Sequence, residues 1–377
     1  IKEEISNVAI PTRAASYEIA KARSEKKNIL LETIISGIDN SKDKILNANQ
    51  LDLDSIKDKN HTNAFIERMT LDEKKIQQMQ KNIEDVIKLE DPVGRREHLS
   101  SRPNGLNVYK QSIPLGVISI IYESRPNVTS DAAVLCLKSG NATVLRGGSE
   151  CFHTNTVIIE VIKDSLTKCG FNPNCINMIP ITDREALKYI LTLDEYIDLV
   201  IPRGGENLIR FIANFSRIPV IKHYKGVCHV YIDEFADPNK ALEISINSKV
   251  QRPGVCNSME TLLIHRKKVS SVLKTIIDAL KESKVIIHST DEVKDMFRNE
   301  KIVKIDEQDW YIEYLDLEMN IKIVDNIDEA ISHIEKYGSL HTESIVTEDI
   351  KKAEYFINSV NSSAIMHNAS TRFNDGN

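Results

Sequence analysis

Short β-rich runs alternate with helix-length segments from residue 117 onward, and this alternation constrains the fold more than any other feature of the chain. The runs expected to form strands are 117–122, 142–146, 176–179, 197–201 and 218–222. The segments between them, each long enough for a crossover helix, are 131–138, 151–168, 184–193 and 206–215. This order predicts a parallel, doubly wound α/β sheet, which binds ligands at the carboxyl ends of its strands.

A second unit of the same kind is expected to begin near Asp233. Its predicted helices are 241–250, 269–281 and 327–337, and its predicted strands are 261–265, 285–288 and 321–324. The first hundred residues show apolar residues at helical spacing and are expected to form helices that cover the first sheet. Residues 102–113, with the turn signal Pro103-Asn104-Gly105, predict a β-hairpin inserted before the first parallel strand.

Composition excludes several classes of function. A chain of 377 residues with 41% apolar residues is expected to form two or so domains. The formal net charge is -6 with basic and acidic residues interspersed, so no nucleic-acid partner is expected. No stretch approaches the roughly 18 apolar residues of a membrane span. Six cysteines without a CxxC pair, and no signal peptide at Ile1, predict reduced thiols in the cytoplasm. The histidines lack the paired spacing of metal ligands, so no metal is expected.

One cysteine, Cys256, lies in a Pro-Gly turn within the segment 251–261, directly before the apolar run 262–264. Such a turn can present the sulfur together with the backbone N–H groups of Cys256 and Asn257, an arrangement suited to attack on a carbonyl. This interpretation makes Cys256 a nucleophile. A buried small apolar residue is the alternative that the segment alone leaves open.

Two Gly-Gly turns follow predicted strands, and each opens a predicted helix. They are Arg146-Gly147-Gly148-Ser149 and Gly204-Gly205. Backbone N–H groups at the start of a helix suit a phosphate-bearing ligand, although each turn alone is also ordinary punctuation between elements. Because both turns are expected at the same edge of one sheet, they favour a single shared ligand. The GxGxxG fingerprint of many dinucleotide-binding proteins is missing from the sequence.

Polar residues also follow the first parallel strand, in the run Tyr122-Glu123-Ser124-Arg125-Pro126-Asn127. Pro126 disfavours a helical conformation at Arg125, which turns polar side chains out at the strand end. This run could bind an oxyanion or an anionic substrate. A solvated loop is the alternative interpretation.

Several motifs in this order resemble the γ-glutamyl phosphate reductases of the aldehyde dehydrogenase superfamily. They are Pro114-Leu-Gly-Val-Ile, Tyr122-Glu-Ser-Arg-Pro-Asn-Val-Thr, Leu137-Lys-Ser-Gly-Asn, Leu145-Arg-Gly-Gly-Ser-Glu, Gln251-Arg-Pro-Gly-Val-Cys-Asn and Asn368-Ala-Ser-Thr-Arg-Phe. The resemblance implies an aldehyde-dehydrogenase-like α/β fold with two doubly wound parallel-sheet domains and a small oligomerisation hairpin. It also implies a cytoplasmic enzyme of proline biosynthesis that uses NADPH to reduce L-glutamyl 5-phosphate, with a homo-oligomer as a possible assembly.

The same resemblance implies a division of the chain. Residues 1–234 would form the NADP-binding domain, with the hairpin 101–114 inserted. Residues 235–365 would form the catalytic domain with the nucleophile, and residues 366–377 would return toward the active site.

The resemblance further assigns roles to individual residues. Cys256 would attack the acyl carbonyl and form a thioester, with the oxyanion bound by its own backbone N–H and by Ser124 or Asn127. The cofactor residues would be Arg146, Gly147, Gly148 and Ser149 at the adenosine ribose and phosphates, Gly204 and Gly205 at the pyrophosphate, and Glu313 at the nicotinamide ribose. Arg146 could pair with the 2′-phosphate of NADPH, and Arg125 or Arg372 could bind the α-carboxylate of the substrate.

Two departures from the wider superfamily bear on these expectations. His223 stands where hydrolytic aldehyde dehydrogenases carry a glutamate general base, which fits a reductase because activated water would destroy a thioester. The family continues past Asn377 with a segment that usually completes the subunit contact. The alternatives are the reductase half of a bifunctional pyrroline-5-carboxylate synthase, a hydrolytic aldehyde dehydrogenase, and a non-catalytic protein on the same fold.

Overall fold

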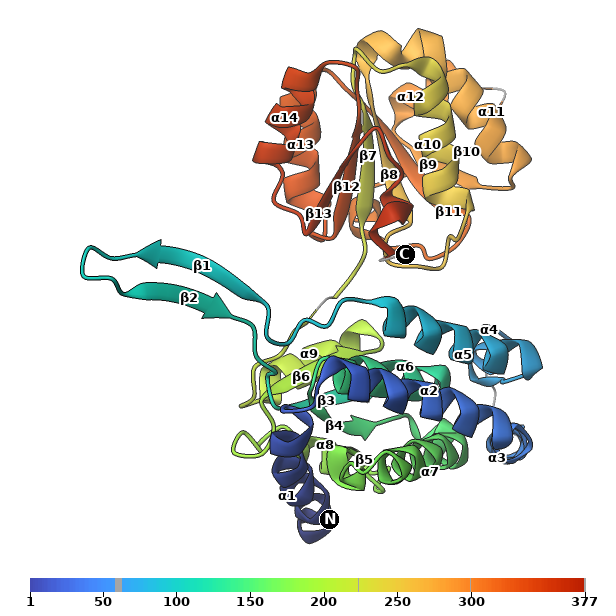
Figure 1. The fold of residues 1–377 in the computed structure, drawn as a ribbon. Coiled ribbons are helices and arrows are strands. Elements are labelled where there is room, and N and C mark those ends of the chain that lie inside the picture. Colours follow the sequence, from blue (N-terminus) through green and yellow to red (C-terminus); the bar gives the residue numbers. More distant parts are fainter. Residues whose placement is uncertain (58–62, 223, 299, 376–377) are drawn as a thin grey trace. The chain divides into compact units, whose positions relative to one another are not determined.

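The computed structural model describes residues 1–57, 63–222, 224–298 and 300–375. They form two compact units, Ile1–His223 and Tyr224–Asn377, each built on a parallel β-sheet with helices around it (Figure 1). The predicted α/β class with two parallel-sheet domains is confirmed. The division falls at residues 223 and 224 instead of 234 and 235, because the strand Cys228–Ile232 pairs within the second sheet.

Helices fill the N-terminal part of the first unit, as the apolar spacing predicts. They are α1 (Lys2–Ile19), α2 (Ser24–Asn40), α3 (Lys42–Ile56), α4 (Asn63–Met69) and α5 (Glu73–Lys88). In α5 the side chain of Asp72 accepts a hydrogen bond from the backbone N–H of Lys75 and caps the helix. Ile76, Met79 and Ile83 then recur at helical spacing and are buried in the core.

The first sheet has the strand order β5-β4-β3-β6, and all its pairs are parallel. Its strands are β3 (Val117–Tyr122), β4 (Ala142–Arg146), β5 (Ile176–Met178) and β6 (Leu199–Arg203). The helices α6 (Asn127–Lys138), α7 (Phe152–Lys168) and α8 (Arg184–Ile190) connect them, and α9 (Glu206–Phe215) follows β6. Every residue of β3 is buried, as expected for a central strand covered on both faces.

One predicted strand of this unit, 218–222, is wrong. It makes an isolated bridge between Val220 and Val200 instead of a ladder. Pro219, the second residue of the segment, has no backbone N–H to donate, which disfavours regular pairing.

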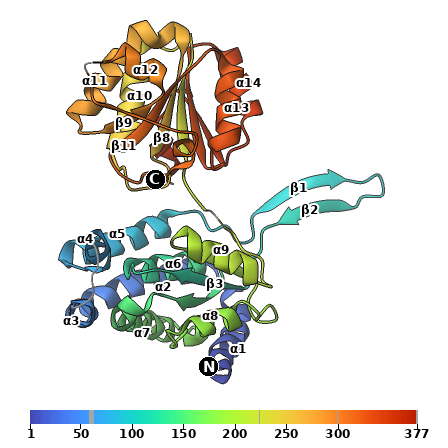
Figure 2. The same cartoon turned by 180° about the vertical axis from the view of Figure 1, so that it is seen from behind.

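The predicted hairpin is present, with the turn at the expected place. Its strands are β1 (Arg96–Ser101) and β2 (Asn107–Gln111), and Gly105 takes a positive φ of 85° in the turn between them. The hairpin begins at Arg96, earlier than the predicted range 101–114, because the first strand is polar and carries no run of β-branched residues. It extends away from the helices of its unit (Figures 1 and 2).

The second sheet has the order β10-β9-β11-β8-β7-β12-β13 and is also parallel throughout. Its strands are β7 (Cys228–Ile232), β8 (Met259–His265), β9 (Ile286–Ser289), β10 (Ile302–Lys304), β11 (Glu318–Val324), β12 (Thr342–Val346) and β13 (Ala364–His367). Its α-helices are α10 (Pro238–Val250), α11 (Lys274–Glu282), α12 (Asp291–Met296), α13 (Ile327–Tyr337) and α14 (Ile350–Ser359).

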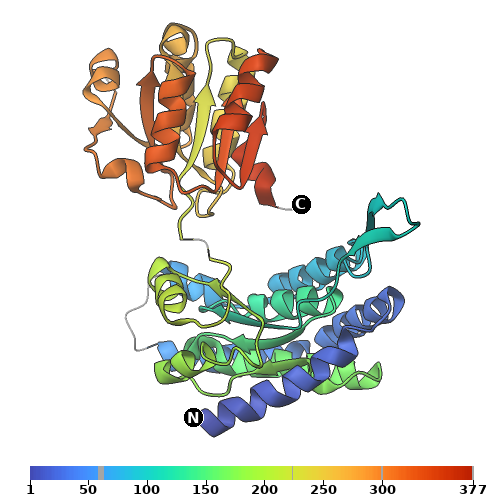
Figure 3. The same cartoon turned by 90° about the vertical axis from the view of Figure 1, so that its left-hand side faces the viewer.

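Helices cover both faces of this second sheet (Figures 2 and 3). The side chains of a strand alternate between the two faces. Val230 and Ile232 of β7 join the apolar cluster that includes Ile276 of α11. Tyr231, between them, joins the cluster on the other face with Phe356 of α14. A sheet buried on both faces leaves its strand ends and the loops beyond them as the places for a site.

Candidate active site

Cys256 is the exposed residue of a β-turn that lies between α10 and β8. The backbone N–H of Ser258 donates to the carbonyl oxygen of Val255 at 3.0 Å, so Cys256 and Asn257 occupy the two central positions of the turn. Cys256 is the only exposed cysteine of the six. The packing interpretation of this cysteine is therefore disfavoured, and a sulfur that a substrate can reach is what a nucleophile requires.

The C-terminal segment returns to this turn through Arg372. Nη1 of Arg372 donates a hydrogen bond to Oδ1 of Asn257, and Arg372 is only 8% exposed. The segment is also fixed on α10, because the hydroxyls of Ser370 and Ser248 lie 3.0 Å apart and the Thr371 N–H donates to the Ser248 hydroxyl at 3.3 Å. A guanidinium group is thus held against the residue next to Cys256.

The backbone of Cys256 rests on the first residues of the second unit. The thiol of Cys228 donates to the carbonyl oxygen of Cys256 at 3.2 Å. Gly226 lies so close that a Cβ atom there would stand 1.8 Å from the same oxygen and 2.6 Å from the Cys256 Cα. The N–H of Gly226 donates to Oε1 of Glu313 at 2.9 Å. Only glycine fits between the carboxylate predicted to bind the nicotinamide ribose and the backbone of Cys256.

A buried ion pair lies beside the turn. Nζ of Lys249 stands 2.9 Å from Oε2 of Glu260, and both side chains are fully buried. Burial raises the pKa of Glu260 to about 7 and lowers the pKa of Lys249, in each case against the attraction of the partner. Oε1 of Glu260 also accepts a hydrogen bond from the N–H of Leu315 at 3.4 Å. The pair therefore helps to hold the loop that carries Glu313.

In the first unit, the loop after β3 contacts both Gly-Gly turns. Because β3 pairs with β4 on one side and β6 on the other, the three strand ends lie next to one another. Oε2 of Glu123 accepts a hydrogen bond from the N–H of Gly205 at 3.0 Å, at the start of α9. On the other side, the hydroxyl of Ser124 donates to Oε2 of Glu150 at 3.1 Å. The predicted phosphate-binding turns thus meet at one edge of the sheet.

The remaining predicted residues of this edge have structural contacts of their own. Nη2 of Arg146 donates to the backbone carbonyl of Thr182 at 3.1 Å. Nδ2 of Asn127 donates to Oδ2 of Asp131 at 3.2 Å within α6. The glycines 147 and 148 are tightly packed: a Cβ atom on them would lie 2.2 Å from an Asn155 nitrogen and 2.6 Å from a Glu150 oxygen, respectively. Ser149 begins a short 3-10 turn before α7, and Arg125 is exposed.

The predicted site residues fall into two groups, one in each unit. Cys256, Glu313 and Arg372 lie in the second unit, whereas Ser124, Arg125, Asn127 and the two Gly-Gly turns lie in the first. Each group is a part of a site in its own right: an exposed cysteine whose neighbour Asn257 binds a guanidinium, and a set of backbone donors beside Arg146. His223 lies outside the described residues.

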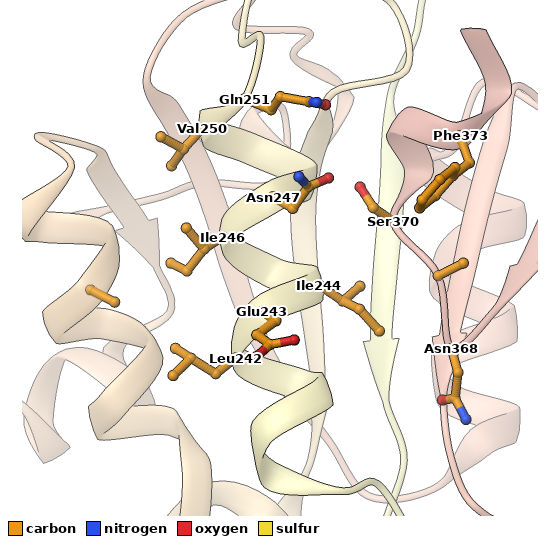
Figure 4. Close-up of a pocket in the computed structure, with 12 residues that line it drawn as sticks. Leu242, Glu243, Ile244, Ile246, Asn247, Val250, Gln251, Asn368, Ser370 and Phe373 are labelled. Carbon is orange, nitrogen blue, oxygen red and sulfur yellow. The ribbon is translucent and has the colours of Figure 1, made fainter. Parts of the chain in front are cut away.

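A surface hollow of about 750 Å³ lies between α10 and the C-terminal segment 368–373 (Figure 4). Asn247 of α10 faces Ser370 across it, and Phe373 lies at its rim. Its lining does not include Cys256, Asn257 or Arg372. The hollow is therefore a neighbour of the nucleophile and does not contain it.

Sequence reasoning did not single out Glu123, Gly226, Cys228 or the pair Lys249 and Glu260. Glu123 stood in the polar run after β3, but its contact with Gly205 follows only once β6 is known to lie beside β3. Cys228 begins a strand that the sequence pattern did not reveal. A charged residue on each side of the cysteine turn was the one signal that could have pointed to the ion pair.

Within residues 1–57, 63–222, 224–298 and 300–375, no three His, Cys, Asp or Glu side chains gather in a way that could hold a metal ion. In the same part of the chain, no helix is long and apolar enough to cross a membrane.

The sequence and the fold of this chain are similar to those of known aldehyde-dehydrogenase-type proteins. The family model described as the aldehyde dehydrogenase family matches residues 3–297. A relative named gamma-glutamyl phosphate reductase, from Geotalea daltonii, is 47% identical over 377 residues, which are 100% of this chain and 90% of the relative. The crystal structure of the gamma-glutamyl phosphate reductase from Thermotoga maritima superposes with a TM-score of 0.95 at 38% identity, covering 99% of this chain and 90% of that one. An engineered glycolyl-CoA reductase with bound NADP⁺ shares the fold, with a TM-score of 0.70 at 14% identity over 98% of this chain and 88% of its own.

Proposed function

This chain belongs to the aldehyde dehydrogenase family, within it to the γ-glutamyl phosphate reductases, and on that premise we propose how its residues work. It reduces L-glutamyl 5-phosphate to L-glutamate 5-semialdehyde and releases phosphate, a step of proline biosynthesis. NADPH supplies the hydride, and the acyl group passes through a thioester on Cys256. One observation carries this proposal. Cys256 is exposed in its turn, and the next residue, Asn257, accepts a hydrogen bond from Arg372.

The first step forms the thioester. The Cys256 thiolate attacks C5 of the acyl phosphate, a carbon–sulfur bond forms, and the carbonyl oxygen takes up the negative charge. The backbone N–H of Cys256 and the side chain of Ser124 or Asn127 are proposed to bind this oxyanion. When the carbonyl reforms, the carbon–oxygen bond to phosphate breaks and inorganic phosphate departs. No base is needed at this point, because phosphate is a good leaving group.

The second step reduces the thioester. A nicotinamide cofactor supplies one hydride to the thioester carbon when it is bound. Cys256 then leaves the resulting tetrahedral centre as a thiolate, so that the aldehyde is released and the thiol is ready for another cycle. Glu313 is proposed to orient the nicotinamide ribose, since the Gly226 N–H already fixes its carboxylate beside the nucleophile.

The residues at the edge of the first sheet fit such a cofactor. The N–H of Gly205 already holds an oxygen anion, the Glu123 carboxylate, at the start of α9. A Cβ atom on Gly205 would have no contact shorter than 3.9 Å, and the atoms nearest to it would be the carboxylate oxygens of Glu123. We propose that Gly204 and Gly205 bind the pyrophosphate and that Arg146, with Gly147, Gly148 and Ser149, binds the adenosine ribose and the 2′-phosphate that distinguishes NADPH from NADH.

Arg372 is the better supported of the two arginines proposed for the substrate α-carboxylate. It lies in the same unit as Cys256 and against the side chain of Asn257, whereas Arg125 belongs to the first unit. A guanidinium can bind a carboxylate through two parallel hydrogen bonds, which would fix the distance from the α-carbon to the nucleophile.

The sequence departure at His223, the bifunctional alternative and the cellular location also belong to this proposal. With His223 in place of a glutamate base, water should be a poor acceptor for the acyl group, which argues against a hydrolytic aldehyde dehydrogenase. The reductase half of a bifunctional synthase would carry out the same chemistry. The cytoplasmic location inferred from the cysteine pattern stays a prediction.

The hairpin is proposed to mediate homo-oligomerisation. Among the described strands, β1 and β2 pair only with each other, and their apolar residues Leu99 and Tyr109 are 55% and 53% exposed. A two-stranded sheet with open edges is marginally stable alone, so pairing with another copy would satisfy its backbone. Light scattering on the chain and on a hairpin-deleted variant tests this, since only the intact chain should form the larger species.

The experiment that tests the function compares the wild type with Cys256→Ser. NADPH oxidation with L-glutamyl 5-phosphate should be lost in the variant, whereas NADPH binding, measured by fluorescence titration, should persist because its proposed contacts lie on other segments. Cys169→Ser, a change at a partly buried cysteine of the first unit, is the matched control and should keep its activity. Substantial turnover by Cys256→Ser would refute the proposal.

A further inference from the structure

The peptide group between Cys256 and Asn257 is held from one side by a second cysteine. The thiol of Cys228 lies 3.2 Å from the Cys256 carbonyl oxygen, and Gly226 packs against the same carbonyl and the Cys256 Cα. Gly226 lies just before β7 and Cys228 is the first residue of that strand, and neither is part of the chemistry described above. A buried thiol is therefore hydrogen-bonded to the backbone of the proposed nucleophile.

The single proton of the Cys228 thiol has two acceptors within reach. One is the Cys256 carbonyl at 3.2 Å, and the other is Nδ1 of His341 at 3.8 Å. Nδ1 of His341 lies 2.7 Å from the Thr342 hydroxyl, which in turn accepts a hydrogen bond from Nδ2 of Asn374 at 2.7 Å. Because the Thr342 oxygen already accepts there, its proton can go to His341. The thiol proton is then directed to the Cys256 carbonyl.

Cys228 is suited to be a donor and not a second nucleophile. It is fully buried, and burial, with the Glu343 carboxylate as the next largest influence, raises the pKa of its thiol well above the ordinary value. The sulfur therefore keeps its proton at neutral pH. A protonated, inaccessible thiol does not compete with Cys256 for substrate.

Fixing the carbonyl also fixes the direction of the following N–H. In a planar trans peptide the C=O and the N–H point to opposite sides. The Cys256 carbonyl points toward Cys228 and Gly226, so the Asn257 N–H points away from these two residues. Within the turn, Cys256 is exposed, whereas Asn257 is buried.

From this geometry we propose that Cys228 is a positioning residue, whose thiol donates to the Cys256 carbonyl and thereby aims the Asn257 N–H at the sulfur and the carbonyl under attack. Gly226 supports the same peptide, because any side chain there would displace it. The inference rests on the proposed role of Cys256 and adds a donor to the oxyanion-binding groups. A merely apolar residue at position 228 would fill the space but would leave the peptide free to rotate.

Two variants separate the donor from the packing. Cys228→Ala removes the donor, and Cys228→Ser keeps one on a side chain of similar size. Removing an oxyanion donor outright costs on the order of 10²–10³ in kcat, so a donor that is only loosened should cost about five- to tenfold. Cys228→Ala should therefore lose about five- to tenfold in kcat with little change in the KM for NADPH, and Cys228→Ser should retain kcat within about twofold.

A second readout does not depend on reductase activity. The rate at which iodoacetamide alkylates Cys256, followed by peptide mass spectrometry across pH, reports the pKa of that thiol. A misaimed N–H no longer stabilises the thiolate, so the midpoint should rise by about 0.5 pH unit in Cys228→Ala and stay in place in Cys228→Ser. Urea unfolding of both variants measures any loss of stability separately.

The outcomes are distinguishable. An unchanged kcat and an unshifted alkylation midpoint in Cys228→Ala would overturn the inference, as would equal losses in the alanine and serine variants. If the wild type reduces no glutamyl phosphate, the proposed function fails, while the alkylation profiles still decide whether Cys228 positions Cys256.

Discussion

The carboxylate of Glu123 accepts a hydrogen bond from the backbone N–H of Gly205, with 3.0 Å between oxygen and nitrogen. The same side chain lies against Gly204, where a Cβ atom would stand 2.6 Å from its carboxyl carbon. This turn opens α9, whose N-terminal end favours negative charge. A carboxylate of the chain therefore occupies the position proposed for the cofactor pyrophosphate, and one anion must leave before the other can bind.

Glu123→Gln should consequently bind NADPH more tightly. The amide carries no charge, so it competes less with the pyrophosphate, and a charge at a helix N-terminus is worth about 0.3–1 kcal/mol. The dissociation constant, measured by fluorescence titration, should fall about two- to fivefold, and Glu123→Asp should stay near the wild type. Weaker NADPH binding by Glu123→Gln would mean that Glu123 contacts the cofactor instead of competing with it.

Arg146→Ala should reduce the preference for NADPH over NADH. A hydrogen bond to a charged group contributes about 1.5–3 kcal/mol, and NADH lacks the phosphate that would receive it. Titration with both cofactors measures the change, and Arg146→Lys, which keeps the charge, is the control. If both cofactors weaken equally, Arg146 has another role at this edge.

Lys249→Met should destabilise the second unit by about 3–5 kcal/mol, because it leaves the Glu260 carboxylate buried without its partner at 2.9 Å. The double variant Lys249→Met with Glu260→Leu should recover most of that loss, since replacing both ions by apolar groups removes the desolvation cost. Urea unfolding of the three proteins tests this. Equal losses in the single and double variants would show that the pair itself stabilises the fold.

His333 should make the chain less stable in acid. It is buried in the second unit beside His229, and burial lowers its pKa from 6.5 to about 2. Below pH 6.5 the His333 side chain therefore binds a proton in the unfolded chain but not in the folded chain. The free energy of unfolding falls as the pH falls below 6.5. At pH 5 this group costs about 2 kcal/mol.

His333→Gln removes that cost, so its free energy of unfolding should drop about 2 kcal/mol less than that of the wild type between pH 7 and pH 5. Urea titrations at the two pH values provide the comparison. The other buried ionisable groups are the same in both proteins and cancel. Parallel losses in the two proteins would contradict the assignment.

Secondary structure was predictable from the sequence where apolar residues recur regularly at the spacing of a helix or a strand. The helix 206–215 and the helix 327–337 have the predicted bounds, and β3 and β4 were also found in full. The strands β7, β10, β12 and β13 were not, because they are short or mix polar with apolar residues. Buried Glu343 within β12 illustrates the reason: its partner His229 is distant in sequence and satisfies it only in the folded chain.

The sequence pointed to individual candidate site residues but not to the contacts between them. The cysteine turn and the Gly-Gly turns carry local signals that sequence reasoning can detect. The contacts of Cys228 with the Cys256 carbonyl and of Arg372 with Asn257 join residues that are far apart in the chain. No local pattern encodes such contacts, because they depend on the order in which the strands pair.

The most direct test of the thioester account is the reaction run in reverse, from glutamate 5-semialdehyde and NADP⁺. If the acyl group on Cys256 is transferred to phosphate and hardly to water, NADPH formation should rise from near zero as inorganic phosphate is added. Heat-treated enzyme and Cys256→Ser serve as blanks. Rapid NADPH formation over many turnovers in phosphate-free buffer, with glutamate as the product, would contradict the account, because it would show that the chain activates water.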